Sequence, residues 1–122
     1  MKNSQYRRKK GLAGLWGALK YSYYGLRIAF REEAAFRSEV MLAVILVPLA
    51  MILHVSRAEK ALLIGSLLLM LLVELLNSAV EATVDRISYE KHHLAAKAKD
   101  ISSAAVFVSV LNCVVIWGVI LI

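Results

Sequence analysis

The pattern of hydrophobic and polar positions is dominated by three long apolar blocks, at residues 40–53, 61–73 and 104–122. A membrane-spanning helix needs about 20 residues, at a rise of about 1.5 Å for each. The third block reaches that length nearly alone, whereas the first two reach it only by including polar neighbours at one end. The pattern therefore predicts an all-α membrane protein, residues 1–122 forming one domain with three transmembrane helices at about 34–55, 58–87 and 99–122.

A different periodicity precedes the first block. Apolar residues recur at steps of three and four, at Leu12, Leu15, Trp16, Leu19, Tyr23, Leu26 and Phe30. Such steps mark one face of a helix. Lys20, Arg27 and Arg31 lie largely off that stripe. We therefore expect an amphipathic helix at about 11–31 that lies on the membrane surface with its aromatic rings at headgroup depth. A helix that packs on a cytosolic partner is the alternative.

The connection between the first two spans is short, at residues 54–60. Such a connection predicts that the two helices are antiparallel neighbours. Ser56 is expected to cap the second helix, with Glu59 at the reciprocal position of a capping box. Pro48 should kink the first span without ending it, because neighbouring helices can satisfy the freed carbonyl.

Composition and charge agree with a membrane protein. Hydrophobic residues make up 60% of the chain and only 20% is charged, too apolar a balance for a soluble domain of this size. Of the 15 Lys and Arg residues, nine lie in 1–38, two in 54–60 and four in 85–100. This distribution explains the net charge of +6 by topology and not by nucleic-acid binding. It predicts a cytoplasmic N-terminus and a C-terminus outside.

The basic start lacks the apolar run and cleavage site of a signal peptide. Cys113 is the one cysteine, which excludes an internal disulfide and favours a small apolar filler.

Candidate chemistry lies where the second span leaves its apolar block. Offsets of three, four, seven and eleven residues place Asn77, Ser78, Glu81 and Asp85 within about 60° of Glu74 around a helix. A carboxylate at the bilayer centre costs about 2.5–3.5 kcal/mol on insertion scales, so acids of this kind are usually functional. A purely structural contact between helices is the alternative.

The types of residue in this stripe favour phosphoryl chemistry. Glu81 and Asn77 offer the hard oxygen donors that Mg²⁺ prefers. Glu74 lies deepest, where poor hydration makes a carboxylate a better general base. A second acidic cluster at residues 31–39 should reach the same end of the membrane by antiparallel pairing, so that carboxylates of two helices share one divalent ion. Lys97 and Lys99 are suited to bind phosphate. The alternative is that they belong to the ordinary excess of basic residues in a cytoplasmic loop.

Four segments resemble one family. They are Glu-Ala-Ala-Phe-Arg at 33–37, Glu-Leu-Leu-Asn-Ser-Ala-Val-Glu at 74–81, Val-Asp-Arg-Ile at 84–87 and Ala-Lys-Asp-Ile-Ser-Ser-Ala-Ala-Val at 98–106. From about Leu15 to its end, the chain is similar to the bacterial diacylglycerol kinases. The resemblance implies an inner-membrane homotrimer, with three spans and one surface helix in each subunit and active sites shared between subunits. It implies transfer of phosphate from ATP, with Mg²⁺, to the lipid diacylglycerol, which gives phosphatidic acid.

The resemblance also implies roles for individual residues. Glu74 matches the general base and Glu33 and Glu81 match metal ligands, with Asn77 and Asp85 in support. The nucleotide contacts that it implies are Tyr21, Glu33, Glu81, Glu90, Lys91, His92, Lys99 and Asp100. The lipid contacts that it implies are Leu19, Tyr23, Arg27, Ala35, Phe36, Glu39, Glu74 and Ser103.

Two positions depart from the family pattern. Gly14 stands where a basic residue is usual, so that contact is missing or is supplied by Lys10 or Lys20. Tyr23 stands where Trp is common. An undecaprenol kinase with the same fold and mechanism is the nearest alternative, and Asn77-Ser78 with Ser102-Ser103-Ala104-Ala105 favours diacylglycerol over it. A non-enzymatic pore former or small transporter is the alternative from another class.

Overall fold

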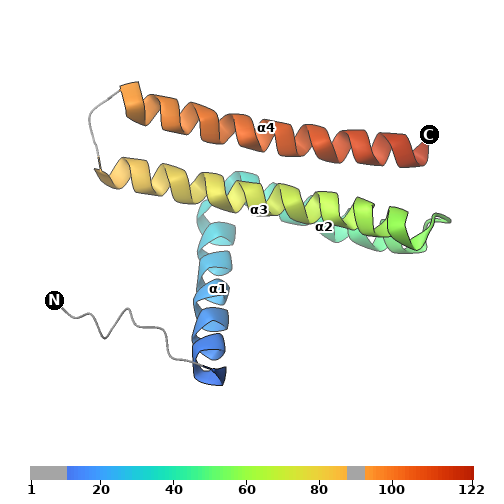
Figure 1. Ribbon diagram of the computed structural model, residues 1–122, viewed down its shortest axis with the longest axis horizontal. Helices are drawn as coiled ribbons and strands as arrows, with labels where there is room; N and C mark the ends of the chain where they lie inside the picture. Colours follow the sequence, from blue (N-terminus) through green and yellow to red (C-terminus); the bar gives the residue numbers. More distant parts are fainter. Residues whose placement is uncertain (1–10, 88–92) are drawn as a thin grey trace.

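The computed structural model describes residues 11–87 and 93–122. The helices are α1 (Leu12–Glu32), α2 (Ala34–Ile52), α3 (Arg57–Ile87) and α4 (His93–Leu121). Helices α2, α3 and α4 run side by side, and α1 lies across them at the start of α2, partway along α3 and α4 (Figure 1). The predicted all-α fold with three segments long and apolar enough to cross a membrane is confirmed, at 19, 31 and 29 residues. The last of these begins at His93, earlier than the expected residue 99.

The corner between α1 and α2 consists of one residue. Glu33 is extended, with φ −110° and ψ 105°, between two helical neighbours. Its amide donates to Ala29 O at 2.9 Å, which closes the last turn of α1. The Arg37 guanidinium donates to the carbonyls of Phe30 at 3.0 Å and Arg31 at 2.8 Å, which are at the end of α1. Because these carbonyls lack partners within their own helix, the guanidinium caps α1 and fixes the bend.

The connection from α2 to α3 has the expected capping box. The Ser56 amide donates to Glu59 Oε1 at 2.9 Å, and the Glu59 amide donates to Ser56 Oγ at 3.1 Å. Lys60 Nζ donates to Met51 O at 2.8 Å and so caps the C-terminus of α2. Pro48 lies inside α2 and does not end it, as predicted. The short connection places α2 and α3 as antiparallel neighbours (Figure 1).

Helix α3 packs against α2 and, more extensively, against α4. Its buried residues follow one face of the helix, at Leu63, Ser66, Leu67, Met70 and Glu74. Leu67 and Met70 pack with Cys113 of α4, and Leu46, Val47 and Trp117 close this apolar cluster. The prediction that Cys113 is a small core residue is confirmed, because its side chain is buried in the cluster. The buried face of α3 thus runs from an apolar core to a carboxylate.

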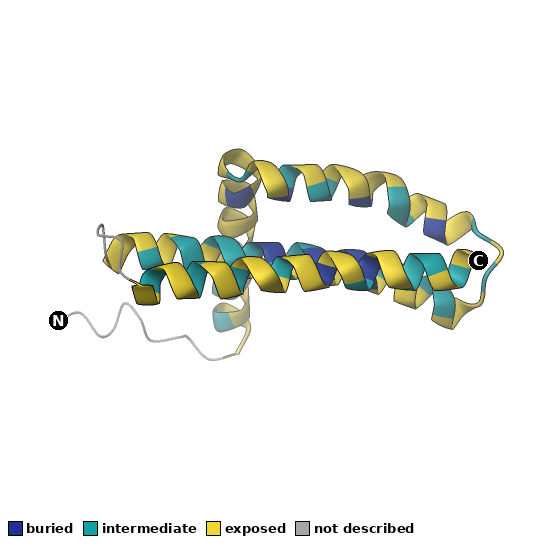
Figure 2. Ribbon diagram, turned by 90° about the horizontal axis from the view of Figure 1, so that it is seen from above, coloured by how far each residue is buried: buried dark blue, intermediate teal, exposed yellow. Residues whose placement is uncertain are grey.

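Most other large apolar side chains are exposed on the outside of the helices (Figure 2). Met41 is 60% exposed, Leu68 58% and Phe107 67%. A soluble protein of this size would cover such side chains. This exposure agrees with helices that are long and apolar enough to cross a membrane.

Candidate active site

The polar stripe predicted on the second span lies on α3, toward the end that meets α1. Glu74 is only 4% exposed. Asn77, Ser78 and Glu81 are half-buried on the turns that follow, and Asp85 is exposed. The exposure of the stripe therefore increases from Glu74, inside the helix packing, to Asp85 at the surface.

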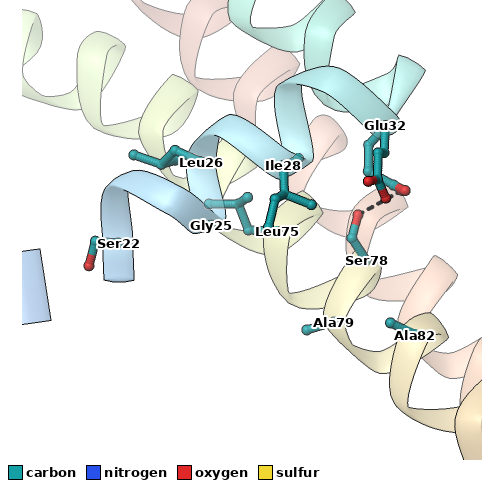
Figure 3. Close-up of a pocket in the computed structure, with 11 residues that line it drawn as sticks. Ser22, Gly25, Leu26, Ile28, Glu32, Leu75, Ser78, Ala79 and Ala82 are labelled. Carbon is teal, nitrogen blue, oxygen red and sulfur yellow. Dashed lines mark hydrogen bonds between the residues drawn. The ribbon is translucent and has the colours of Figure 1, made fainter. Parts of the chain in front are cut away.

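The corner residue Glu33 contacts this stripe directly. Ser78 Oγ donates to Glu33 Oε1 at 2.9 Å (Figure 3). The extended backbone at Glu33 places its carboxylate where α1 ends and α2 begins, beside the C-terminal half of α3. The expectation that antiparallel pairing brings the 31–39 cluster to the same end as the stripe is confirmed by this bond.

Glu74 lies among three other carboxylates. Its side chain interacts with that of Glu39 on α2, and Glu33 and Glu81 are close enough to repel it electrostatically. Glu39 Oε1 is buried and has no hydrogen-bond partner within the described residues. Four carboxylates gathered at the boundary of an apolar bundle repel one another unless protons or cations intervene. A proton or a cation at this position would relieve that repulsion.

Side chains of α4 complete this end of the bundle. Ser102 Oγ donates to Asn77 Oδ1 at 2.5 Å. Lys99 forms an ion pair with Asp85, with 2.5 Å between Nζ and Oδ1. Both side chains are substantially exposed, at 41% for Lys99 and 63% for Asp85, so this ammonium remains accessible to an anion from water. The polar end thus combines carboxylates with a neighbouring cation.

The carboxylates suit a metal ion that arrives with a ligand of its own. Among residues 11–87 and 93–122, no group of three or more His, Cys, Asp or Glu side chains is placed to hold an ion. Mg²⁺ in phosphoryl-transfer sites is usually bound by one or two carboxylates, with phosphate oxygens and water supplying the remaining ligands. Glu33 and Glu81, both half-buried near Glu74, fit that donor set.

A pocket of about 530 Å³ lies between α1 and α3 beside these carboxylates (Figure 3). Small and apolar side chains form most of its wall, with Glu33 and Ser78 at one edge: Ser22, Gly25, Leu26, Ile28, Ala29, Glu32, Glu33, Leu75, Ser78, Ala79 and Ala82. A wall that is apolar apart from one charged edge suits an amphiphilic molecule whose polar group faces the carboxylates.

The remaining predicted residues are placed as follows. On α1, Leu19, Tyr21, Tyr23 and Arg27 are exposed. Exposed positions elsewhere are Ala35, Asp100 and Ser103, whereas Phe36 is buried at 4% exposure and packs inside the fold. Glu90, Lys91 and His92 lie outside the described residues.

Two contacts at the site had not been anticipated. Ser78 was expected on the stripe but not as the donor to Glu33, and Ser102 was not expected to contact the stripe. Helical spacing identifies residues that share a face of one helix. It carries no information on the register between two helices, which decides these pairs. The one signal for Ser102 is its place as a polar residue at the start of an apolar block.

Comparison with known proteins shows which family the chain belongs to. Residues 20–121 match the family described as prokaryotic diacylglycerol kinase. A diacylglycerol kinase of Pseudomonas aeruginosa is 51% identical over 121 residues, which cover 99% of this chain and 98% of the relative. That of Haemophilus influenzae is 49% identical over 111 residues, 91% of this chain and 94% of the relative. That of Escherichia coli K12 is 43% identical over 111 residues, 91% of each chain.

Proposed function

Because this chain belongs to the prokaryotic diacylglycerol kinase family, we propose that it phosphorylates diacylglycerol in the bacterial cytoplasmic membrane. The γ-phosphate of ATP is transferred to the lipid hydroxyl, and the products are phosphatidic acid and ADP. The distribution of Lys and Arg supports a cytoplasmic N-terminus and a C-terminus outside. In that orientation the polar end of α3 faces the compartment that supplies ATP.

The observation that carries this proposal is the buried carboxylate of Glu74 at the boundary of the apolar bundle. Glu74 takes the proton from the lipid hydroxyl as its oxygen attacks the γ-phosphorus in line with the departing ADP oxygen. A base at this depth meets a substrate that cannot leave the bilayer, while the exposed turns beyond it meet a nucleotide from water. The location of the site thus matches the two substrates.

Glu33 and Glu81 would hold Mg²⁺, which would supply positive charge to neutralise the phosphates of ATP. Ser78 holds the Glu33 carboxylate in place. Lys99 contributes positive charge beside them. The remaining nucleotide contacts of this proposal are Tyr21, Glu90, Lys91, His92 and Asp100. The proposed lipid contacts are Leu19, Tyr23, Arg27, Ala35, Phe36, Glu39, Glu74 and Ser103.

We assign the active form as a homotrimer. The exposed apolar surface, the open pocket between α1 and α3 and the partly exposed stripe support a site that a second subunit covers. A cross-linking or mass measurement of the detergent-solubilised protein tests this assignment separately from activity.

The proposal is tested by offering diacylglycerol and undecaprenol side by side to the purified protein, with ATP and Mg²⁺. Preferential phosphorylation of diacylglycerol supports it. Preference for undecaprenol changes the substrate and keeps the mechanism. If a folded sample phosphorylates neither lipid, the kinase assignment is wrong.

The role of Glu74 has its own test. Glu74→Gln removes the proton acceptor at nearly constant size, and loss of a general base costs about 10²–10⁴-fold in rate. The matched control is Glu59→Gln at the other end of α3, because glutamine also completes a capping box. A Glu74→Gln protein that keeps more than about a tenth of the wild-type rate contradicts the assignment.

A further inference from the structure

A chain of polar contacts links α4 to Glu74. Ser102 Oγ donates to Asn77 Oδ1 at 2.5 Å, across the interface between α4 and α3. Asn77 lies one turn after Glu74 on α3, a spacing at which two side chains share a face of the helix and are neighbours. Ser102 therefore reaches the buried carboxylate through one intervening amide.

The direction of these bonds is determined by the groups themselves. An ionised carboxylate can only accept hydrogen bonds, so Asn77 can bond Glu74 only through its NH₂ group. The amide oxygen then faces away and needs a donor, and the Ser102 hydroxyl supplies one. With the amide reversed, Oδ1 would face the Glu74 carboxylate and repel it. The hydroxyl thus selects the amide orientation that stabilises the ionised carboxylate.

A serine in a helix has a local alternative to such a contact. Ser109, seven residues later on α4, donates to the carbonyl of Val106 in its own helix at 2.7 Å. Ser102 instead bonds a side chain on the neighbouring helix. Both Ser102 and Asn77 are half-buried, so water competes with their contact less than it would at the surface. The bond is therefore an interaction between helices and not a by-product of helix geometry.

We propose that Ser102 is a positioning residue for the phosphoryl-transfer reaction, acting through Asn77 to hold the Glu74 carboxylate. This inference rests on the proposed function of Glu74 as the base. Without the hydroxyl, the amide of Asn77 rotates more freely and spends part of the time in orientations that do not hold Glu74. The base is then less often aligned with the lipid hydroxyl, while the binding of either substrate is unaffected.

The kinetic test compares Ser102→Ala with Ser102→Thr, which keeps the hydroxyl. A pocket of about 410 Å³ beside Ser102 leaves room for the added methyl group. We expect Ser102→Ala to lower kcat by about 3- to 10-fold, the effect of one hydrogen bond, with KM for both substrates unchanged. We expect Ser102→Thr to stay within about twofold of wild type on the same basis. Ser109→Ala is the matched control, because it removes a hydroxyl of α4 that bonds only its own helix.

A second measurement needs no catalytic activity. The chain has three asparagines, Asn3, Asn77 and Asn112, so a sample labelled with ¹⁵N-asparagine gives few side-chain NH₂ signals. The Asn77 pair is identified by its absence from Asn77→Ser. We expect Ser102→Ala to shift this pair, and expect Ser102→Thr and Ser109→Ala to leave it near its wild-type position.

The outcomes separate the two proposals. A folded wild type that phosphorylates no lipid refutes the proposed function, while the Asn77 signals still show whether Ser102 orients the amide. An active wild type whose Ser102→Ala variant keeps its kcat and its Asn77 signals overturns the positioning role. A raised lipid KM with unchanged kcat also overturns it, because Ser102 would then contact substrate. Failure of Ser102→Thr to restore both kcat and the signals has the same consequence.

Discussion

The bond between Ser78 and Glu33 offers a direct test of how the site holds its nucleotide. Ser78→Ala removes the hydroxyl that donates to Glu33 Oε1 at 2.9 Å and leaves both backbones unchanged. Alanine is also the better helix former of the two residues, so α3 itself is not weakened. If Glu33 binds Mg²⁺ with ATP, the substitution frees a metal ligand without deleting it.

The size of the effect follows from burial. A hydrogen bond to a charged group contributes about 1.5–3 kcal/mol when water cannot replace it. Glu33 and Ser78 are both half-buried, so water can take over part of the role of the hydroxyl. We therefore expect the Ser78–Glu33 hydrogen bond to contribute about 1 kcal/mol to nucleotide binding, which corresponds to about a fivefold change in an equilibrium constant. The expected result is about a fivefold rise in Kd for Mg-ATP, with kcat within about twofold of wild type on the same basis.

The assay is calorimetric titration of the folded protein with Mg²⁺ and ATP, together with lipid phosphorylation at varied ATP. Thr83→Ala is the control, because its hydroxyl donates only to Ala79 O of the same helix, at 2.7 Å. Unchanged affinity for the nucleotide complex would refute the idea that Ser78 holds a metal ligand. A collapse of kcat with unchanged affinity would place Ser78 in the chemical step instead.

Two further predictions concern stability, measured by reversible unfolding in mixed detergent. Leu67 is fully buried on α3, so Leu67→Ala should lower the free energy of unfolding by about 2–5 kcal/mol. Its neighbour Leu68 is 58% exposed, so Leu68→Ala should lower it by about 0.5 kcal/mol or less. Equal losses for the two variants would contradict the assigned core. Ser56→Ala removes the hydroxyl that accepts from the Glu59 amide and should lower the free energy of unfolding by about 1 kcal/mol. Ser56→Thr keeps the capping hydroxyl and should lower it by less.

Much of the fold follows from patterns within single segments. Apolar block length is enough to predict three membrane-crossing helices, and the Ser56–Glu59 spacing is enough to predict the start of α3. The start of α4 at His93 was harder to predict, because the residues before 99 are helix formers without an apolar pattern. Hydropathy marks the part of a helix that lies in lipid and not the turns that extend beyond it.

The residues of the site on a single helix were likewise predictable, whereas their partners on other helices were not. The residues that share a face of α3, from Glu74 to Asp85, are predictable because helical geometry alone relates them. The partners of that face on other helices depend on register, and register is set by packing far from the site, at Leu67, Met70 and Cys113. The contacts of Ser78 with Glu33 and of Ser102 with Asn77 could therefore not be read from spacing.

The residues that stabilise the bundle are different from those that form the site, so the two should respond differently to substitution. One part of α3 is held by apolar packing of Leu67 and Met70, while the part that carries the site is linked to its neighbours by polar pairs. Hydrogen bonds between membrane helices contribute about 0.6 kcal/mol on average, much less than a buried leucine. Removing Ser78 Oγ or Ser102 Oγ should therefore alter binding or rate without unfolding the protein. Register is fixed by residues that do no chemistry, so the carboxylates can be gathered together despite their repulsion.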